Sequence, residues 1–382
     1  MSADRPGDAE QQAESGPAGA ELSSVEDAIA TIADGGMVVV IDDDDRENEG
    51  DLVMAAAKAT PQQLAFIIRN TCGIVCAPMA SEDAKRLHLD PMVAANDAPL
   101  GTAFTISVDY RFDTTTGISA EERCSTVRAL ASGNSGAADF VRPGHIFPLI
   151  AKDGGVLMRS GHTEAAVDLA RLAGLPPVGV ICELVNDDGT VKRGPEVQTF
   201  AKEHGLKVIS VADLIAYRQR RERLVDCVGE FEIETEIGTA KGYTYSTPFD
   251  DIHHMALVFG GVGDGIAVPT RLHRENVIED VFGQHTLLSD VFKRFDDEGR
   301  GVLVYLREGA AGVPVGEFSQ SNPPRNSDHS RKQDWRDVGL GAQILRDLGV
   351  SSIRLLATRS LQYVGLGGFG VSIDKTELLS AG

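Results

Sequence analysis

The segment that decides the fold runs from residue 37 to residue 57 and changes character twice. An apolar run, Met37-Val38-Val39-Val40-Ile41, leads into Asp42-Asp43-Asp44-Asp45-Arg46-Glu47-Asn48-Glu49-Gly50-Asp51, and Leu52-Val53-Met54-Ala55-Ala56-Ala57 follows at once. Seven of the ten middle residues are acidic. Because the first run is typical of a buried strand, the carboxylates lie between two core segments and not on a solvated tail.

Carboxylates held between core segments need compensation. Taking several of them out of water is costly unless a cation or hydrogen-bond donors face them. A hard divalent cation such as Mg2+ or Mn2+ is the usual partner of oxygen ligands. The alternative is an ordinary charged turn at a strand end, and the acidic run by itself does not decide between the two interpretations.

The composition excludes several classes of function. The chain has 382 residues, enough for two or three domains, and 42% of them are hydrophobic. The formal net charge of -21 argues against nonspecific binding to nucleic acid or to anionic membranes. No apolar run of about 18 residues occurs, so no transmembrane helix is expected.

Two features of the sequence, its first twenty residues and its cysteines, indicate the cellular compartment of the protein. The first twenty residues lack the basic start and apolar core of a secretory signal, and their polar composition predicts a disordered leader. The irregular spacing of the cysteines suits a reducing cytosol better than a disulfide framework, so we expect a cytoplasmic protein. The five cysteines are Cys72, Cys76, Cys124, Cys182 and Cys227. Cys72 and Cys76 do not form a C-x-x-C pair, which argues against a zinc knuckle.

Hydrophobic periodicity and capping residues predict an α/β protein with two domains. Expected helices cover residues 21–34, 62–70, 81–87, 120–132, 163–173, 195–204 and 211–223. Expected strands cover residues 37–41, 73–77, 104–108, 178–184 and 207–211. The pattern then changes to strands at 231–235 and 243–245, so we place a boundary near residue 225, between domains at 21–225 and 226–382. Residues 318–335 are polar and predict an exposed loop, and a helix at 341–348 and a strand at 353–357 follow.

Three further segments set ionisable groups among glycines or apolar residues. They are Arg142-Pro143-Gly144-His145-Ile146-Phe147-Pro148, then Arg159-Ser160-Gly161-His162-Thr163-Glu164, and finally Glu183 at the end of an apolar strand. A lone histidine is more often structural than a ligand, and a lone glutamate at a strand end is usually solvated. Their joint occurrence with the acidic run favours a site, although the sequence does not show that they converge.

In this order the motifs resemble 3,4-dihydroxy-2-butanone-4-phosphate synthase, an enzyme of the riboflavin pathway. The resemblance covers about residues 24–223. Its motifs are the run from Asp45 to Asp51, Arg142-Pro143-Gly144-His145, Gly161-His162-Thr163-Glu164-Ala165, and Cys182-Glu183-Leu184 followed by Asn186-Asp187-Asp188-Gly189. The resemblance implies that D-ribulose 5-phosphate loses its C4 as formate and gives 3,4-dihydroxy-2-butanone 4-phosphate. It also implies a homodimer with residues of both subunits at each site.

The resemblance assigns roles to residues of this chain. Glu47 and His162 would ligate Mg2+ or Mn2+, while His145 and Glu183 would act as acid and base. The residues that would contact substrate are Arg46, Glu47, Asp51, Arg159, Ser160, Gly161, His162, Thr163 and Glu183. Within this set Arg159, Gly161 and Thr163 would hold the phosphate, since free N–H groups at a helix start favour an anion. Glu49 would lie near the metal or transfer protons.

Two further positions bear on the site. By the resemblance Cys76 lies near the substrate, but a buried small hydrophobe is an equal interpretation. Residues 115–119 resemble a loop that closes over the sugar. Glu122, just behind this loop, stands where the family usually has Asp, and its extra methylene extends the reach of the carboxylate while keeping the charge.

Residues from about 228 to 382 resemble GTP cyclohydrolase II, through Arg271-Leu272-His273-Arg274-Glu275 and the run from Gly339 to Val350. That enzyme activates water with a zinc ion held by three cysteines. Here Asn276 occupies the first of these positions, Leu287 and Ser289 lie near the other two, and no cysteine follows Cys227. We therefore expect no zinc and no GTP cyclohydrolase activity.

Three alternatives stay open from the sequence. The chain is a bifunctional enzyme that also hydrolyses GTP, a non-catalytic regulatory protein with a synthase fold, or a metal-dependent sugar-phosphate enzyme with another substrate. The missing cysteines argue against the first alternative, and the intact ionisable motifs argue against the second.

Overall fold

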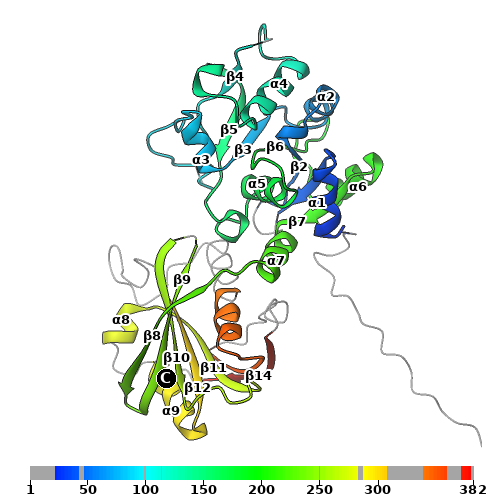
Figure 1. Ribbon diagram of the computed structural model, residues 1–382. Helices are drawn as coiled ribbons and strands as arrows, with labels where there is room; N and C mark the ends of the chain where they lie inside the picture. The colour runs from blue at the N-terminus through cyan, green and yellow to red at the C-terminus, as the bar shows by residue number, and fades with distance from the viewer. Residues whose placement is uncertain are drawn as a thin grey trace, which may run out of the picture.

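The computed structural model describes residues 22–42, 47–98, 100–112, 114–248, 250–282, 287–307, 339–358 and 371–379. Within these ranges the chain forms two seven-stranded sheets with helices packed against them (Figure 1). This arrangement confirms the predicted α/β class. None of the helices in the same ranges is long and apolar enough to cross a membrane.

The first sheet has the strand order β4-β5-β3-β6-β2-β1-β7. Its strands are β1 (Val38–Ile41), β2 (Gly50–Ala55), β3 (Cys76–Met79), β4 (Val108–Tyr110), β5 (Phe140–Ile150), β6 (Gly179–Glu183) and β7 (Lys207–Ser210). Strand β2 is antiparallel to both of its neighbours, β1 and β6. The start of β2, which follows the acidic run in sequence, therefore lies beside the carboxyl end of β6.

The helices that accompany this sheet pack in two groups. They are α1 (Val25–Ala33), α2 (Pro61–Asn70), α3 (Ser81–Arg86), α4 (Ala120–Leu130), α5 (His162–Leu172), α6 (Pro195–His204) and α7 (Val211–Arg221), with short 3-10 turns η1 (Ala56–Lys58), η2 (Ala137–Asp139) and η3 (Gly155–Leu157). Helices α1, α5 and α7 contact one another, whereas α2 packs on α4. Because α5 also contacts β2, β3 and β6, its first residue is held beside the strands that carry the acidic residues.

Local sequence signals set the helix ends. Ser24 caps α1 by accepting the N–H of Asp27 (3.1 Å), and Thr60 caps α2 through a reciprocal capping box with Gln63. Helix α6 ends at Gly205, whose φ of 65° is accessible to glycine at little cost. These signals are short-range, which is why the sequence predicted these helices closely.

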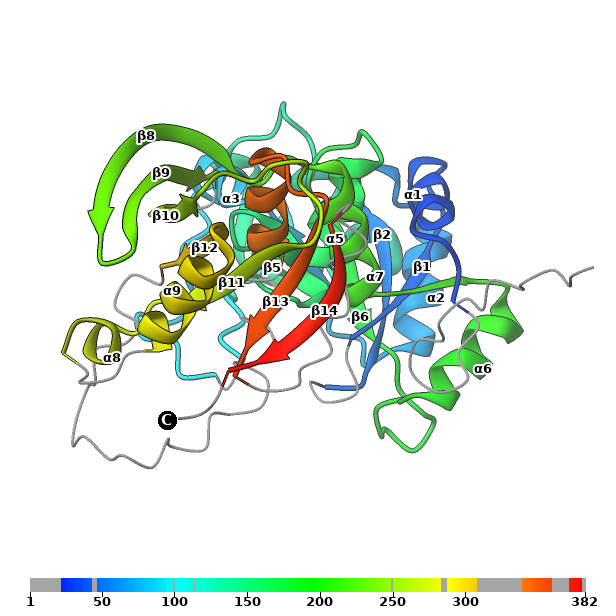
Figure 2. The ribbon, with the colours of Figure 1, turned by 90° about the horizontal axis from the view of Figure 1, so that it is seen from below.

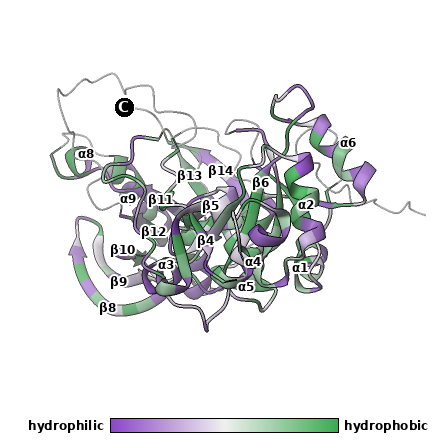
Figure 3. Cartoon of the chain, turned by 90° about the horizontal axis from the view of Figure 1, so that it is seen from above, coloured by the Kyte–Doolittle hydropathy of each residue, from purple (hydrophilic) through white to green (hydrophobic). Residues whose placement is uncertain are grey.

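The second sheet has the order β14-β13-β11-β12-β10-β9-β8. Its strands are β8 (Asp226–Thr235), β9 (Gly238–Thr247), β10 (Asp250–Phe259), β11 (Val268–Arg274), β12 (Gly301–Leu306), β13 (Ser352–Ala357) and β14 (Ser372–Leu378), and its helices are α8 (Val277–Phe282), α9 (Leu287–Glu298) and a segment at residues 339–347. Figure 2 shows β13 and β14 side by side at one end of this sheet. In Figure 3 β6 of the first sheet is green, whereas α6 alternates between purple and green as a half-exposed helix should.

Helix α7 joins the two sheets (Figure 1). On one side the guanidinium of Arg218 is buried against the carboxylate of Asp168 in α5 (2.7 Å) and the carbonyl of Gly154 (2.7 Å). On the other side Gln343, from the helical segment 339–347, donates to the carbonyls of Gln219 (3.1 Å) and Glu222 (2.9 Å). The chain segment that links the domains is thus hydrogen-bonded to both.

Two predicted strands are displaced, and several strands, β5 among them, were not predicted. The strand expected at 73–77 is found at Cys76–Met79, where β3 pairs in parallel with β5 through Pro78 although proline is rare in sheet interiors. The strand expected at 104–108 begins only at Val108, because Phe104 and Thr105 make isolated bridges to other segments. Strand β5 was not predicted, since Pro143, Gly144 and Pro148 together indicate a turn. The predicted leader at 1–20 and loop at 318–335 lie outside the described residues.

Candidate active site

Asp42 organises the acidic turn. Its carboxylate is buried at the end of β1, where its two oxygens accept the backbone N–H groups of Glu47 (3.2 Å) and Glu49 (3.0 Å). These bonds satisfy part of the buried charge and fix the backbone that carries Glu47. The side chain of Glu49 instead pairs with Arg193 (3.0 Å). Arg46 lies outside the described residues, so its contact with substrate stays a prediction.

Glu47, Asp51 and His162 converge on one point. His162 is the first residue of α5 and is buried. Its Nδ1 lies 3.7 Å from Oε2 of Glu47 and 3.9 Å from Oδ2 of Asp51. Residues more than a hundred positions apart in sequence are therefore brought together by the packing of α5 on β2.

The donor atoms around this point suit a divalent cation. One ligand atom each from Asp42, Glu47 and His162 lies within 4.8 Å of the other two. Two carboxylates and one imidazole leave positions for water or substrate oxygens, which suits an ion such as Mg2+. The sequence predicted Glu47 and His162 as ligands but not Asp42. The position of Asp42 directly after a buried strand is the feature that could have indicated it.

Asp51 and Glu183 supply a second pair of carboxylates. They are direct partners in the antiparallel register of β2 and β6. Burial raises the pKa of the Asp51 carboxyl to about 7, and neighbouring carboxylates, Glu183 first among them, act in the same direction, whereas His162 opposes the shift. Two carboxyls with one of them able to hold a proton at neutral pH are suited to general acid–base chemistry.

His145 has a partner that the sequence did not single out. Its Nδ1 lies 2.7 Å from Oδ2 of Asp109 on β4, and Oδ1 of the same carboxylate accepts the N–H of His145 (2.8 Å). Asp109 is buried, whereas the imidazole is 40% exposed. Gly117 lies against this pair, since a Cβ there would come 2.0 Å from Oδ2 of Asp109. In the sequence Asp109 stands between Val108 and Tyr110, just as Glu183 stands at the end of an apolar strand. A carboxylate in such a setting indicates a candidate site residue.

The start of α5 gathers the residues predicted to hold phosphate. Ser160 and Thr163 are buried there, and within the described residues the Ser160 hydroxyl has no hydrogen-bond partner. The guanidinium of Arg159 is held by Glu164 (2.6 Å) and by the hydroxyl of Thr102 (3.1 Å). At Gly161 a Cβ would lie 2.6 Å from the Arg159 guanidinium, so only glycine fits without a shift. An anion at this helix start would meet a hydroxyl and free N–H groups.

Glu122 anchors the segment that was predicted to close over the sugar. Its carboxylate accepts the backbone N–H and the hydroxyl of Thr115 and the N–H of Ser119 (3.2 Å). The hydrogen bonds from Thr115 are the main cause that lowers the pKa of Glu122 to about 2. Cys76 is buried on β3, and burial raises the pKa of its thiol, which agrees with the interpretation as a small hydrophobe.

Comparisons with known proteins agree with this geometry. A family model described as 3,4-dihydroxy-2-butanone 4-phosphate synthase matches residues 26–217, and one described as GTP cyclohydrolase II matches residues 226–377. The riboflavin biosynthesis protein RibBA of Nocardia farcinica is 48% identical, over 93% of this chain and 90% of its own length. The chloroplastic bifunctional RIBA 1 of Arabidopsis thaliana is 47% identical, over 94% and 69%. The chloroplastic monofunctional RIBA 2 of the same plant is 46% identical, over 92% and 76%.

Solved structures give the same result. RibBX, a two-domain 3,4-dihydroxy-2-butanone 4-phosphate synthase from A. baumannii, is 37% identical with a TM-score of 0.77, over 94% of this chain and 100% of its own. A synthase solved with two magnesium ions is 43% identical with a TM-score of 0.51, over 52% of this chain and 98% of its own. The chain therefore belongs to the 3,4-dihydroxy-2-butanone 4-phosphate synthase family of riboflavin-biosynthesis enzymes, with a second domain of GTP cyclohydrolase II type.

Proposed function

We propose that the site around Glu47 and His162 converts D-ribulose 5-phosphate into 3,4-dihydroxy-2-butanone 4-phosphate and formate. The observation that carries the proposal is the convergence of the Asp42–Glu47–His162 donor set with the Asp51–Glu183 pair. This reaction needs proton removal next to a carbonyl, stabilisation of an enediolate, and loss of water. The first and last steps need acids and bases, and the second needs positive charge.

Each residue of the candidate site has a proposed task. Glu47 and His162, with Asp42 as an additional donor, would hold Mg2+ or Mn2+, which supplies positive charge and a fixed geometry for adjacent sugar oxygens. Asp51 and Glu183 move protons, because one of them retains a proton near neutral pH. His145 acts as acid or base, with Asp109 holding its ring. Arg159, Gly161 and Thr163 bind the phosphate, with the buried Ser160 hydroxyl as an additional donor, and Arg46 contacts the rest of the substrate.

We also propose that the second domain does not hydrolyse GTP. All five cysteines of the chain lie at or before Cys227, so the domain cannot offer the three thiolates of the family's zinc site. In the described residues the backbone N–H of Asn276 donates to Asp280 (2.9 Å), and the two candidate metal-binding groups both lie in the first domain, between Asp42 and Glu183. Relatives of similar identity carry the names bifunctional and monofunctional, so the names alone do not decide this point.

Formate release tests both proposals. The full chain is incubated with ribulose 5-phosphate or with GTP, in Mg2+, with and without added Zn2+, and zinc content is measured on the purified protein. We expect formate from the pentulose phosphate alone and no stoichiometric zinc. Formate from GTP would overturn the assignment of the second domain. Formate from neither substrate would favour a regulatory protein, and turnover of a different pentulose phosphate would favour altered specificity.

We further propose the domain limits 21–225 and 226–382, a cytoplasmic homodimer, and catalytic sites that both subunits complete. Leu224 and Val225, at the end of the first range, already pack in the hydrophobic cluster of the second sheet with Tyr245 and Val304, which supports a change of domain close to this limit. Light scattering tests the dimer. Mixing two inactive variants that carry different site substitutions tests the shared sites, since subunit exchange should restore part of the turnover.

A further inference from the structure

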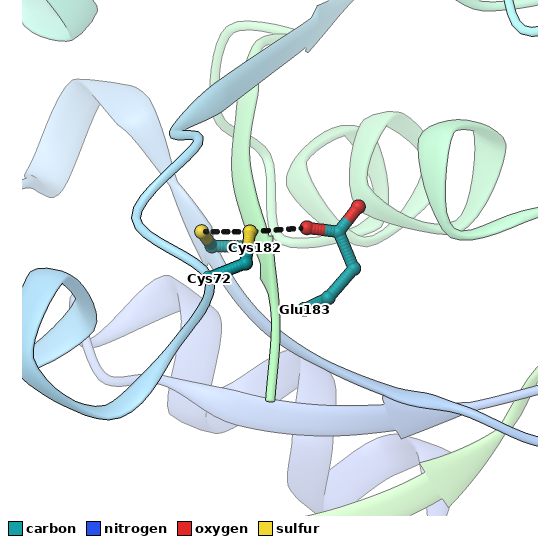
Figure 4. Close-up of side chains that lie close together, drawn as sticks. All are labelled: Cys72, Cys182 and Glu183. Carbon is teal, nitrogen blue, oxygen red and sulfur yellow. Dashed lines mark hydrogen bonds between the residues drawn. The ribbon is translucent and has the colours of Figure 1, made fainter. Parts of the chain in front are cut away.

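Two cysteines lie in contact beside Glu183, and the proposed reaction uses neither. Sγ of Cys72 is 3.6 Å from Sγ of Cys182, and the Cys72 thiol donates a hydrogen bond to Oε2 of Glu183 (2.8 Å). Figure 4 shows the three side chains in one row, with Cys72 between its two partners. Cys72 is exposed and Cys182 is buried.

The backbone holds the two thiols in this position. Thr71 pairs with Leu184 in an antiparallel bridge, and the N–H of Cys72 donates to the carbonyl of Glu183 (2.9 Å). Cys182 lies on β6, where its Sγ accepts from the Thr71 hydroxyl (3.0 Å) and contacts the carbonyl of Ile74 (3.2 Å). Because Cys182 lies on β6 and Cys72 directly follows the Thr71–Leu184 bridge, the backbone brings the two residues together.

We propose that Cys72 and Cys182 form a reversible oxidation site, at which a hydroperoxide joins the two thiols in a disulfide and thereby lowers synthase turnover. The sulfur atoms must move from 3.6 Å to the bonded distance of about 2.05 Å. Rotation of the exposed Cys72 side chain toward β6 provides this movement. The effect on turnover rests on the proposed role of Glu183, whereas formation of the disulfide does not.

The steps balance with a hydroperoxide as the oxidant. Glu183 accepts the proton of Cys72, and the thiolate attacks the peroxide and breaks its O–O bond. This gives a sulfenic acid, and the leaving oxygen takes the proton back from Glu183 and departs as water or an alcohol. The Cys182 sulfur then attacks the sulfenic sulfur of Cys72, which forms the S–S bond and breaks the S–O bond. The oxygen leaves as water and takes the proton of the Cys182 thiol with it. Two thiols lose two electrons in all, and the peroxide is reduced. Cys72 starts the sequence because it is exposed.

The disulfide removes a hydrogen bond from Glu183. In the reduced protein the Cys72 thiol holds one carboxylate oxygen of Glu183. In the oxidised protein neither sulfur carries a proton, so this oxygen loses its donor and the side chain is free to turn from its position opposite Asp51. A base displaced from its reacting atom loses catalytic efficiency, since proton transfer requires hydrogen-bond reach.

A thiophilic metal ion is the competing occupant. Ligand atoms of Cys72, Cys182 and Glu183 lie within 4.8 Å of one another. A structural zinc site normally has four protein ligands, and this group offers three, one of which already contacts Thr71 and Ile74. The geometry therefore favours a sulfur–sulfur bond.

The test uses the full chain treated with hydrogen peroxide after metal removal by chelation. We measure thiols under denaturing conditions, the disulfide-linked peptides by mass spectrometry, and formate release after gel filtration into Mg2+ buffer. Cys72→Ser tests the exposed partner and Cys182→Ala the buried one. Cys227→Ser is the matched control, because this thiol lies on β8 of the other sheet. For each variant the rate of formate release by the oxidised protein is divided by the rate of the reduced protein.

We expect the free thiols to fall from five to three, a peptide pair linking Cys72 to Cys182, and an approximately tenfold loss of turnover that dithiothreitol reverses. The Cys227→Ser variant should respond in the same way, Cys72→Ser should keep its rate, and Cys182→Ala should form no disulfide. The proposal would be overturned by a disulfide between Cys72 and Cys76, or by a sulfinic acid without a disulfide in the parent protein. It would also be overturned if peroxide inactivated Cys72→Ser as strongly as the parent protein. Loss of thiols only when Zn2+ is added would assign the group to a metal. If the disulfide forms but no variant releases formate, the synthase proposal fails and not the oxidation site.

Discussion

Asp51 and Glu183 face each other as register partners across β2 and β6, with their carboxyl groups at the same edge of the sheet. Like charges directly opposite each other destabilise an antiparallel pair. Burial, with this repulsion added to it, raises the pKa of Asp51 to about 7, so the pair keeps a proton up to near-neutral pH. A carboxyl that is neutral in the resting site and close to its pKa is well placed to give and take protons.

Asp51→Asn should separate stability from activity. The folded-state pKa of about 7 lies above the ordinary value of 3.8, so the folded protein binds the extra proton and its free energy of unfolding falls as pH rises from about 4 to about 7. In chelator, the variant should lack this fall and be more stable than the parent at pH 8, by roughly 1 kcal/mol or more. Formate release should drop about 100-fold. Denaturant unfolding at pH 4, 6 and 8 checks the first part, and a parallel pH dependence in both proteins would contradict it.

Glu47→Ala and His162→Ala should abolish turnover while the protein stays folded, because each removes a proposed metal ligand. Mg2+ raises the thermal midpoint of the parent protein if it binds the folded state, and this rise should disappear in both variants. Glu203→Ala is the matched control, since this carboxylate is exposed on α6. Near-normal formate release by either site variant would refute the ligand assignment.

Asp109→Asn should act through His145. The amide cannot stabilise a protonated imidazole as the carboxylate does, so we expect kcat to fall about 100-fold or more. KM should stay close to the parent value, which a collapse of the site would not allow. Asp97→Asn, at an exposed position, is the control. A raised KM together with a lower thermal midpoint would make Asp109 structural only.

Gln343→Ala should weaken the joint between the two sheets without affecting the chemistry. The variant loses donors to the carbonyls of Gln219 and Glu222 and the acceptor for the N–H of Leu224 (2.6 Å). We expect a loss of about 1–3 kcal/mol in the free energy of unfolding, with formate release unchanged. Gln62→Ala, on the exposed side of α2, should change stability little. Equal stability of the two variants would mean that the joint contributes nothing.

The parts of the fold that short-range signals control could be predicted from the sequence. Helix α6 runs from Pro195 to His204 as expected, because proline at its start and glycine after its end act locally. Strand β5 could not be predicted, since Pro143 and Gly144 carry turn signals that its pairing with β4 and β3 overrides.

The candidate site also has residues that could be predicted from the sequence and residues that could not. Glu47 and His162 each belong to a recognisable motif, and their types indicate metal chemistry. Asp42 and Asp109 stand outside those motifs, and their contribution depends on which buried carboxylate meets which partner. That information lies in strand order and register, which arise from pairings between distant segments and not from any single stretch of sequence.

The parallel pairing of β1 with β7 has a consequence for synthesis of the protein. Val38 lies opposite Lys207, so the sheet that begins with one of the first strands cannot be completed until about residue 210 has been translated. Closing so long a loop is slow compared with local helix formation. On the ribosome the nascent chain therefore carries its acidic turn without its partners for most of the first domain. The sheet of the first domain can thus be completed only shortly before β8, the first strand of the second sheet, is translated.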